Sequence, residues 1–318
     1  MPVRNKVVTV ICLCYNHAPF LEEAVRSVLK QEGVRTQIIL VDDFSIDDSR
    51  TKIALLQQEY PDLLVMMNER NEGNCRSFNK ALRWATGDYI IDFATDDVMP
   101  PERLKKQVAF FEKQNPNVGV VYTNVALINR AGNYIKTLYP QDVVLPEGDV
   151  FEALLTTSFI MPSSMMIRKA VLDELDGYDT TLTYEDFDFW VRSARTWYYA
   201  YQPEVLMKQR VLSGSYSTRF TQRKNDLVPS TVKVCEKALK LIRTESEKKA
   251  LIHRLKRVMR QCLFTENTDA LQQTFMLLAK LDYKHPYVEM IKLIAPMNLP
   301  LHRLYRAYLW LKSLLSLS

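Results

Sequence analysis

The 318-residue sequence has only eight glycines, and none of them belongs to a recognisable phosphate-binding loop. The GxxxxGK pattern of P-loop proteins and the GxGxxG pattern of dinucleotide-binding domains are both absent. There is no HExxH motif, and no Cys/His group has the spacing of a zinc site. These absences remove the main support for a P-loop enzyme, a nicotinamide enzyme or a zinc enzyme. Carboxylates are the polar signal that remains.

Long apolar runs and paired cysteines are also missing. No uninterrupted apolar stretch reaches the roughly 18 residues that a membrane-spanning helix needs. The apolar run at residues 7–14 is short and polar residues follow it at once, so it does not predict a signal peptide. An odd number of cysteines, five, without a CxxC pair predicts buried free thiols in a reducing compartment. We therefore expect a cytoplasmic protein.

The charge is distributed unevenly along the chain. The net charge is +5, yet residues 225–318 hold 16 Lys/Arg against 8 Asp/Glu, and residues 1–224 hold 26 against 29. A change in charge of this size suggests a boundary between two regions. We place it at residue 224, with one domain at residues 1–224 and a basic region at residues 225–318.

The first region alternates apolar, β-branched runs with stretches of helical periodicity. Strands are predicted at residues 7–14, 37–41, 63–67 and 88–93, and helices at 18–31, 46–60, 75–85 and after Pro100–Pro101. Four βα units with short links predict an α/β fold with a doubly wound, mostly parallel sheet. Further strands are predicted at residues 118–128, 134–138 and 163–167, and a helix near residue 185. Residues 225–318 read as helices throughout.

Ligands of such sheets bind at the carboxyl ends of the strands, which directs attention to the polar residues there. Asp96 and Asp97 follow the fourth strand. Adjacent carboxylates are suited to Mg²⁺ or Mn²⁺ shared with substrate phosphates, or they cap the next segment. Asp42 and Asp43 end the second strand and could accept hydrogen bonds from a base or ribose, or cap the loop that follows.

Three further groups have open interpretations. Tyr15, at the end of the first strand, could stack on a base or simply pack. Arg76 could neutralise phosphate or be solvated. Glu185 and Asp186 begin a helix among aromatic residues. There an acid is favoured by the helix dipole, and it could also serve as a general base.

Taken together, these segments resemble family 2 of the glycosyltransferases, which has the GT-A fold. The resemblance rests on the order and spacing of segments that are each weak alone: residues 8–16, 20–31, 41–45, 71–73 with Asn79, 85–90, 94–97 and 185–186. They span about residues 6 to 220 and leave the last hundred residues uncovered. The resemblance implies a GT-A domain that binds a nucleotide sugar.

The resemblance also implies roles for individual residues. Tyr15 would stack near the base, and Asp43, rather than Asp42, would bind it. Asp96 would contact the ribose, Asp97 would ligate the metal, Arg76 is a weaker candidate for a phosphate contact, and Glu185 would lie near the acceptor. Asp186 would be the general base that deprotonates an acceptor hydroxyl for attack on the anomeric carbon, and a single displacement of this kind inverts that centre.

The chain departs from the family pattern at three positions. Ala94 stands where the family usually has Asp, so metal binding rests on Asp96 and Asp97 and is expected to need the nucleotide. Phe44 replaces a usual Gly and Phe78 a usual Arg, which weakens the expected neutralisation of phosphate. Arg210 and Arg219 could supply charge from a mobile segment near residues 213–215, or could be ordinary surface residues.

The C-terminal residues form a basic, amphipathic segment. Residues 290–318 contain no Asp or Glu, and apolar and aromatic residues recur at helical spacing between 301 and 315. Such a helix can lie in an anionic membrane surface, or it can dock on the protein. We expect residues 297–318 to contact a membrane surface, on the inner face, if the acceptor is lipid-linked. Nucleic acid is a poorer partner, because no basic groove or stacking motif occurs in the acidic region.

The sequence thus predicts an inverting glycosyltransferase that uses Mn²⁺ or Mg²⁺. It would move a sugar from a nucleoside diphosphate sugar, most simply a UDP-sugar, to a hydroxyl of a glycan or lipid-linked acceptor. A nucleotidyltransferase would need a glycine-rich loop after the first strand, where Tyr15–Asn16–His17 stands instead. A non-catalytic protein of the same fold that binds nucleotide sugars or glycans is the second alternative.

Overall fold

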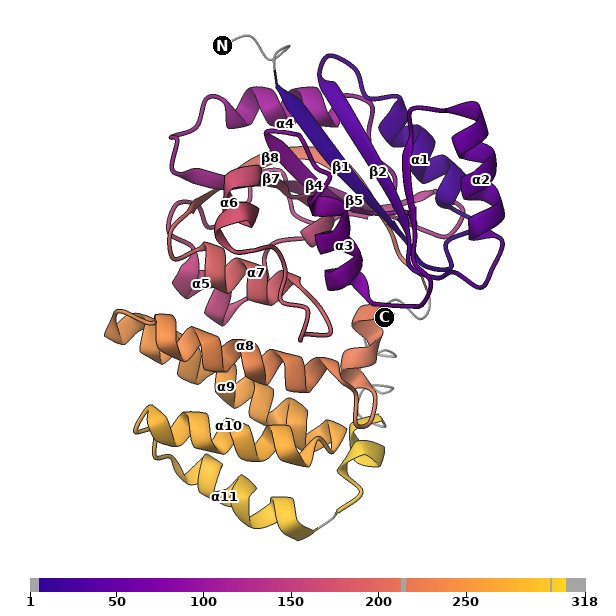
Figure 1. Cartoon of the computed structure of the whole chain (residues 1–318). Coiled ribbons are helices and arrows are strands. Elements are labelled where there is room, and N and C mark those ends of the chain that lie inside the picture. Colours follow the sequence, from indigo (N-terminus) through magenta and orange to yellow (C-terminus); the bar gives the residue numbers. More distant parts are fainter. Residues whose placement is uncertain (1–5, 213–215, 298, 307–318) are drawn as a thin grey trace. The chain divides into compact units, whose positions relative to one another are not determined.

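The computed structural model describes residues 6–212, 216–297 and 299–306, apart from the side chains of residues 216–218. Contacts divide the chain into two compact units (Figure 1). The first consists of Met1–Val150 and Ser158–Ser213 and contains the sheet. The second consists of Phe151–Thr157 and Gly214–Ser318 and is helical.

The first unit is built on an eight-stranded sheet. Its strands are β1 (Val7–Cys14), β2 (Arg35–Asp42), β3 (Leu64–Met67), β4 (Tyr89–Ala94), β5 (Val118–Ile128), β6 (Tyr134–Thr137), β7 (Met166–Arg168) and β8 (Tyr198–Arg210). Their order is β3-β2-β1-β4-β7-β5-β6, with β8 beside β5. β1 to β4 run parallel, β5 and β8 pair in parallel, and β7 is antiparallel to both its neighbours. The predicted doubly wound, mostly parallel sheet is confirmed.

Helices cover both faces of this sheet. Helices α1 (Leu21–Leu29), α2 (Ser49–Glu59) and α4 (Arg103–Phe111) contribute to one buried core together with alternate residues of β1 and β4, among them Val8, Val10 and Phe93. α3 (Asn74–Leu82) packs on β1 and β2 and crosses in front of the sheet in Figure 1. Because β1 is buried on both faces, its sequence is a continuous apolar run rather than an alternating one.

Several elements differ from the sequence-based expectation. The long strand β8 was not predicted, nor were the short helices α5 (Phe151–Thr156) and α6 (Lys169–Glu174). The strand expected at residues 163–167 begins as a 3-10 turn, Pro162–Ser164, and is extended only as β7. In β8, the register with β5 jumps from Gln202 to Val205, so Pro203 and Glu204 lie outside the ladder. Because a proline within an apolar run argues against a central strand, the sequence did not predict β8.

The second unit is helical, as predicted for the C-terminal region. It contains α8 (Leu227–Leu241), α9 (Glu245–Thr265), α10 (Thr268–Lys280), α11 (Pro286–Ile294) and, from earlier in the chain, α5. The guanidinium of Arg254 on α9 is buried and donates to the carbonyl oxygens of Leu154 (2.7 Å) and Leu155 (2.8 Å). The charge thus satisfies the carbonyls at the end of α5 and ties it to the unit.

Residues 297–318 were predicted either to contact a membrane surface or to dock on the protein, and most of them, residues 307–318 and Asn298, lie outside the described residues. The described start of this segment is helical over residues 301–306 and packs within its own unit. The ring of Tyr305 stacks on Phe264 at 5.2 Å, and the His302 ring lies 3.2 Å from the Phe264 carbonyl oxygen. This part of the segment is therefore docked on the end of α9.

The cysteines are Cys12, Cys14, Cys75, Cys235 and Cys262; all five are buried free thiols, as predicted. Across the three described ranges, no helix combines the length and the apolar character required to cross a bilayer.

Candidate active site at the strand ends

The register of the parallel strands brings the predicted polar residues to one edge of the sheet. Cys14 at the end of β1 lies beside Asp42 at the end of β2, and Asp42 lies beside Met67 at the end of β3. On the other side of β1, Leu13 lies beside Ala94 at the end of β4. The residues that follow these strands therefore share one edge, where ligands of such sheets bind.

Asp43 organises the loop that follows β3. Its Oδ1 accepts hydrogen bonds from the Asn68 side chain and from the Glu72 amide, both at 2.8 Å, and its Oδ2 accepts one from the Gly73 amide at 2.8 Å. A carboxylate offers about four acceptor positions. Asp43 thus fixes residues 68–73 and keeps capacity for one further donor.

Asp42 is buried more deeply and is only partly satisfied. Its Oδ2 accepts from the Ser45 amide (3.1 Å) and lies 3.3 Å from Nε of Arg50. Its Oδ1 is buried and has no hydrogen-bond partner within the described structure. The contact with the Ser45 amide is the loop-capping role that the sequence offered as the alternative to ligand binding. The Oδ1 atom of Asp42 remains an acceptor without a donor.

Two aromatic rings are exposed beside these carboxylates. Tyr15 is 44% exposed, and Phe44 is 38% exposed with its backbone at φ 63°. Asn16, also at positive φ (58°), accepts from the Ile46 amide through its side chain at 2.8 Å and so braces the turn. A glycine would suit position 44 because the backbone there is in the left-handed conformation. The phenylalanine at this position adds an exposed ring to the site.

Asp96 and Asp97 lie in the turn after β4 with different environments. Asp97 is 3% exposed and its Oδ1 accepts from the Arg210 amide at 2.8 Å, whereas the Asp96 side chain is 22% exposed. Burial, and then the negative charge of Asp96, raise the pKa of Asp97 well above its usual range. A positive charge bound at this turn would relieve both effects.

The pair fits a divalent cation of the type that is shared with phosphates. Mg²⁺ and Mn²⁺ take oxygen ligands and commonly use one or two carboxylates together with substrate oxygens. Within residues 6–212, 216–297 and 299–306, no group of three or more His, Cys, Asp or Glu side chains is arranged to hold a metal. Asp96 and Asp97 would therefore need oxygens from the nucleotide to complete such a site.

Arg210 is a buried residue of β8, so its expected placement in a mobile or surface segment is wrong. Its guanidinium donates to the carbonyl oxygens of Asp96 (2.8 Å), Asn129 (3.1 Å) and Arg130 (2.9 Å) and pairs with Glu23 at 2.7 Å. Because its backbone amide also donates to Asp97, Arg210 fixes the conformation of the turn after β4.

Arg219 and Arg76 are the other arginines that the sequence suggested. Arg219 has a side chain 38% exposed and pairs with Asp226 at 2.8 Å within the helical unit. Arg76 is exposed on the first turn of α3. It has no hydrogen bond or ion pair among the described residues, so its guanidinium is available to an anion.

Glu185 and Asp186 begin helix α7 (Asp186–Ser193), as predicted. Glu185 is the N-cap residue. Burial raises the pKa of its carboxyl, and Asn74, the first residue of α3, is a group that lowers that pKa. Asp186 is partly exposed, and its Oδ1 lies 2.5 Å from the Phe187 amide at the open end of the helix. Both acids thus belong to the same unit as the strand-end carboxylates.

Two charged groups near this site were not assigned a role from the sequence. Asp92 lies within β4, where an acid in an apolar run was visible. Arg103, on α4, is fully buried, and its charge acts on Asp97. Burial lowers the pKa of Arg103 to about 9. An arginine after Pro100–Pro101 gave no sequence signal of burial, because its partners Met165 and Met207 are remote in the chain.

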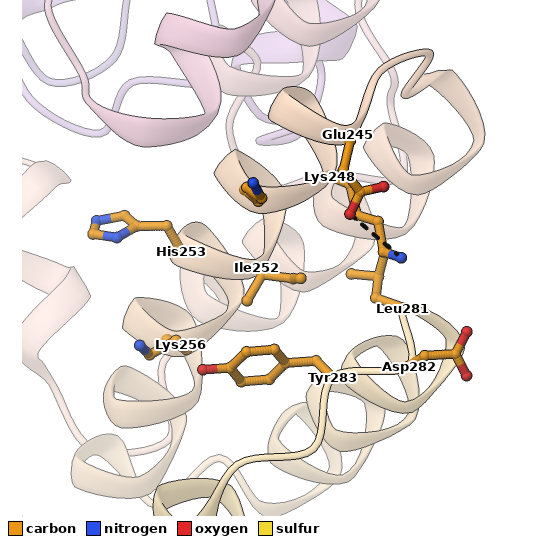
Figure 2. A pocket seen from close by; sticks show the side chains of 9 residues that line it. Glu245, Lys248, Ile252, His253, Lys256, Leu281, Asp282 and Tyr283 are labelled. Carbon is orange, nitrogen blue, oxygen red and sulfur yellow. Dashed lines mark ion pairs between the residues drawn. The ribbon is translucent and has the colours of Figure 1, made fainter.

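A recess of about 470 Å³ in the helical unit contains none of the predicted site residues (Figure 2). It lies between α9 and the turn after α10, with Lys256 5.9 Å from the centre of the Tyr283 ring and Lys248 3.8 Å from Glu245. Its mixed charges give no indication of a particular ligand.

Comparison with known sequences places the sheet unit in a family. The profile of Glycosyl transferase family 2 matches residues 9–176. An uncharacterized glycosyltransferase of Methanocaldococcus jannaschii is 28% identical over 222 residues, which cover 69% of this chain and 76% of the relative. The putative glycosyltransferase EpsE of Bacillus subtilis is 30% identical over 220 residues, covering 67% and 76%.

Comparison with solved structures agrees on the fold. TarS from S. aureus, solved in complex with UDP, has a TM-score of 0.65 at 18% identity, covering 86% of this chain and 82% of that one. The mannosyltransferase PcManGT from Pyrobaculum calidifontis, solved with GDP-Man and Mn²⁺, has a TM-score of 0.57 at 21% identity, covering 95% and 82%. The fold is of the GT-A type. The chain belongs to glycosyl transferase family 2 and is a glycosyltransferase.

Proposed function

We propose that this glycosyltransferase moves a sugar from a nucleoside diphosphate donor to a hydroxyl of a glycan or lipid-linked acceptor, with inversion at the anomeric carbon. The product would serve polysaccharide or cell-envelope glycan synthesis. One observation carries the proposal: within a family 2 fold, two pairs of carboxylates lie at the ends of β2 and β4, the parallel strands on either side of β1, and a third acidic pair begins α7.

The nucleoside is proposed to bind at the ends of β1 and β2. Tyr15 is exposed there and would stack on the base. Asp43 keeps one acceptor position after holding the loop and would accept a hydrogen bond from the base; Asp42 is the less suitable of the two because it is fully buried. Arg76 would contact phosphate from the first turn of α3.

The diphosphate is proposed to lie at the turn after β4. Asp97 would ligate Mn²⁺ or Mg²⁺ and Asp96, which is more exposed, would contact the ribose. When bound, such a cation neutralises charge on the leaving diphosphate. Arg210 supports the assignment, because its amide and guanidinium hold the turn in place from the protein side.

The chemical step is proposed to use Asp186 as general base. A carboxylate at the first turn of a helix is stabilised in its charged form by the helix dipole, and the partial exposure of Asp186 leaves it accessible to a hydroxyl. Removing the hydroxyl proton as the oxygen attacks the anomeric carbon, opposite the leaving nucleotide, inverts that carbon. Glu185 would line the same region.

The donor is proposed to be a UDP-sugar. The structural neighbour TarS was solved with UDP and with UDP-GlcNAc, and PcManGT with GDP-Man, so nucleotide sugars of two bases occupy related folds. The proposal of UDP over GDP rests on the higher TM-score of TarS.

The acceptor is proposed to reach the enzyme at the cytoplasmic face of a membrane. Residues 225–318 carry 16 Lys/Arg against 8 Asp/Glu, a balance that favours anionic surfaces. Residues 297–318 would supply the contact. In this proposal, residues 1–224 carry catalysis and residues 225–318 carry the attachment.

A thermal-shift screen against UDP, GDP, dTDP and CMP, with and without Mn²⁺, tests the donor site. We expect one nucleoside diphosphate to stabilise the protein in a metal-dependent way, since a ligand that binds only the folded state raises its stability. Asp97→Ala should abolish the metal-dependent part. Asp62→Ala, an exposed acid before β3, serves as the control and should keep it.

Turnover distinguishes an enzyme from a non-catalytic binding protein of the same fold, an alternative that Ala94 supports. We expect wild-type protein to release nucleoside diphosphate from its donor and Asp186→Asn to release far less. Donor binding without any release, in the presence of metal and candidate acceptors, would favour the binding protein.

A further inference from the structure

The positive charge of the helical unit is concentrated on α9. Both acids of this helix, Glu245 and Glu247, stand in its first turn. The rest of it, residues 248–265, contains six Lys/Arg and no Asp or Glu. After the first turn, α9 is therefore a purely basic helix.

Five basic side chains of α9 share one face. At 3.6 residues per turn, positions 249, 253, 256, 257 and 260 fall within an arc of about 100° and extend along about 16 Å of the helix. The opposite face is buried and includes Leu251, Leu255 and Val258. We call the five residues the basic stripe: Lys249, His253, Lys256, Arg257 and Arg260.

The basic stripe is not neutralised by its own protein. Across the described ranges, no ion pair or side-chain hydrogen bond is made by Lys249, Arg257 or Arg260. Lys256 lies 5.9 Å from the centre of the Tyr283 ring, which carries no charge. The buried Arg254 of the same helix instead binds the carbonyl oxygens of α5. The stripe thus presents charge that no acid in the described chain offsets.

The stripe forms a long, open surface. Lys249, His253, Arg257 and Arg260 are exposed, and Lys256 is half-buried. Figure 2 shows His253 and Lys256 projecting from α9 toward the same side, where they line part of the recess. The stripe continues beyond this recess to Arg257 and Arg260. An extended row of cations matches a surface with many separate negative charges better than it matches one small anion.

The chain that follows α9 has too few acids to cover the stripe. Residues 267–318 contain three Asp/Glu against six Lys/Arg, and residues 290–318 contain no acid at all. The C-terminal segment would therefore bring further positive charge to this face. Charge complementarity points to a partner outside the helical region.

We propose that the basic stripe of α9 binds the headgroups of an anionic membrane surface. A membrane meets a straight helix along its length, so the whole stripe engages at once, and each Lys or Arg held there strengthens binding by about fivefold. The inference rests on the proposed attachment of residues 225–318 to a membrane. It assigns the main contact to α9 rather than to residues 297–318.

Cosedimentation with lipid vesicles tests the stripe. Vesicles of phosphatidylcholine mixed with phosphatidylserine should bind the wild-type protein, vesicles of phosphatidylcholine alone should bind it far less, and added salt should release it. The combined substitution Lys249→Gln, Arg257→Gln and Arg260→Gln should weaken binding to the mixed vesicles by about 100-fold. Glutamine has nearly the helix propensity of lysine and arginine, so α9 should persist.

Two control variants lose the same net charge at other places. The first replaces three exposed lysines of α8, α10 and α11 with glutamine: Lys240, Lys280 and Lys292. The second replaces the three Lys/Arg of residues 297–318: Arg303, Arg306 and Lys312. Each control should weaken binding by less than about tenfold.

The pattern among the three variants decides the assignment. An equal loss in all three would mean that net charge acts rather than the stripe, and would overturn the inference. A loss confined to the second control would also overturn it, and would place the contact in residues 297–318. Self-association of the wild type that is sensitive to salt, without binding to mixed vesicles, would assign the stripe to a second copy of the chain instead.

A thermal shift with UDP and Mn²⁺, measured on the stripe variant, keeps this inference apart from the proposed donor site. No stripe residue belongs to that site, so the variant should unfold near the wild-type temperature without ligand and show the wild-type shift with it. Binding of wild type to mixed vesicles without any nucleotide shift would reject the donor site and leave the stripe standing. A nucleotide shift in a wild-type protein that ignores mixed vesicles would overturn the stripe alone.

Discussion

At the scale of single residues, the turn after β4 is held mainly by backbone contacts. Asp97 accepts a hydrogen bond from the backbone amide of Arg210. The guanidinium of Arg210 donates to backbone carbonyl oxygens and to the carboxylate of Glu23. No contact of the Arg210 guanidinium is to a carboxylate of Asp96 or Asp97 among the described hydrogen bonds. The two carboxylates are therefore positioned without a direct contact to the Arg210 guanidinium, which suits a site that receives a cation with its substrate.

Arg210→Lys should destabilise the protein by about 2–4 kcal/mol. A lysine cannot reach all the carbonyls that the planar guanidinium satisfies, and it leaves a charge buried where the arginine side chain is only 1% exposed. Urea unfolding measures the loss. Arg219→Lys, at an exposed ion pair, should change stability by less than about 1 kcal/mol. Equal effects of the two substitutions would contradict the supporting role of Arg210.

Asp186→Asn should lower kcat for sugar transfer by about 10²–10⁴-fold, the usual contribution of a general base. The amide keeps the size of the side chain and the partial exposure at the start of α7. Nucleotide binding, followed by the thermal shift, should be retained because Asp186 lies outside the strand-end loops. A parallel loss of binding and turnover would show that the residue acts on binding or folding instead.

The sequence predicted where the site residues lie in the fold better than it predicted which groups contact them. The strand-end carboxylates lie at one edge because short-range periodicity set the strand boundaries. Which of their oxygens are already bound depends on remote contacts: Arg210 reaches Asp97 across 113 positions of the chain. No local sequence pattern carries that information. The prediction therefore put Arg210 in a mobile or surface segment and gave Asp92 no role.

At the scale of elements, the predictable strands were those with uniform chemistry. β1 and β5 coincide with the expected ranges because both are mostly apolar segments that are buried on both faces. β8 contains Gln202, Pro203 and Glu204 and depends on pairing with β5 across a register shift. Helix α5 has only six residues, too few to show periodicity, and depends on Arg254 of α9. Such elements are formed by tertiary contacts rather than by local preference.

Thr244→Ala should destabilise the helical unit by about 1 kcal/mol. Thr244 is the N-cap of α9 and accepts from the Glu247 amide, while the Glu247 side chain returns a contact to the Thr244 amide. Hydrogen exchange of the first turn of α9 and urea unfolding measure the effect. Thr268→Ala, at an exposed position in the first turn of α10, is the same substitution without a cap and should be nearly neutral. A neutral Thr244→Ala would exclude the capping contribution.

At the scale of the whole molecule, acids of two kinds respond to pH in opposite senses. Glu59 and Glu204 have lowered pKa values because of Arg26 and Lys106, and their stabilising contribution is lost as the pH falls. Asp92 and Glu185 have raised pKa values, mainly through burial. Their contribution is complete below the unfolded-state pKa and is lost as the pH rises through the folded-state value. Glu185 directly precedes the proposed base Asp186, so part of this loss of stability at higher pH arises beside the proposed acceptor site.

Asp92→Asn isolates this effect, because the exposed acids are the same in both proteins and cancel in the comparison. Above the ordinary Asp value of 3.8, wild type should lose stability with rising pH by up to about 1.4 kcal/mol per pH unit for this group. The variant lacks that loss, so the difference in unfolding free energy between variant and wild type should shift in favour of the variant from pH 5 to pH 8. Urea unfolding at four pH values measures it. A difference that stays constant with pH would mean that Asp92 ionises in the folded protein as readily as in the unfolded chain.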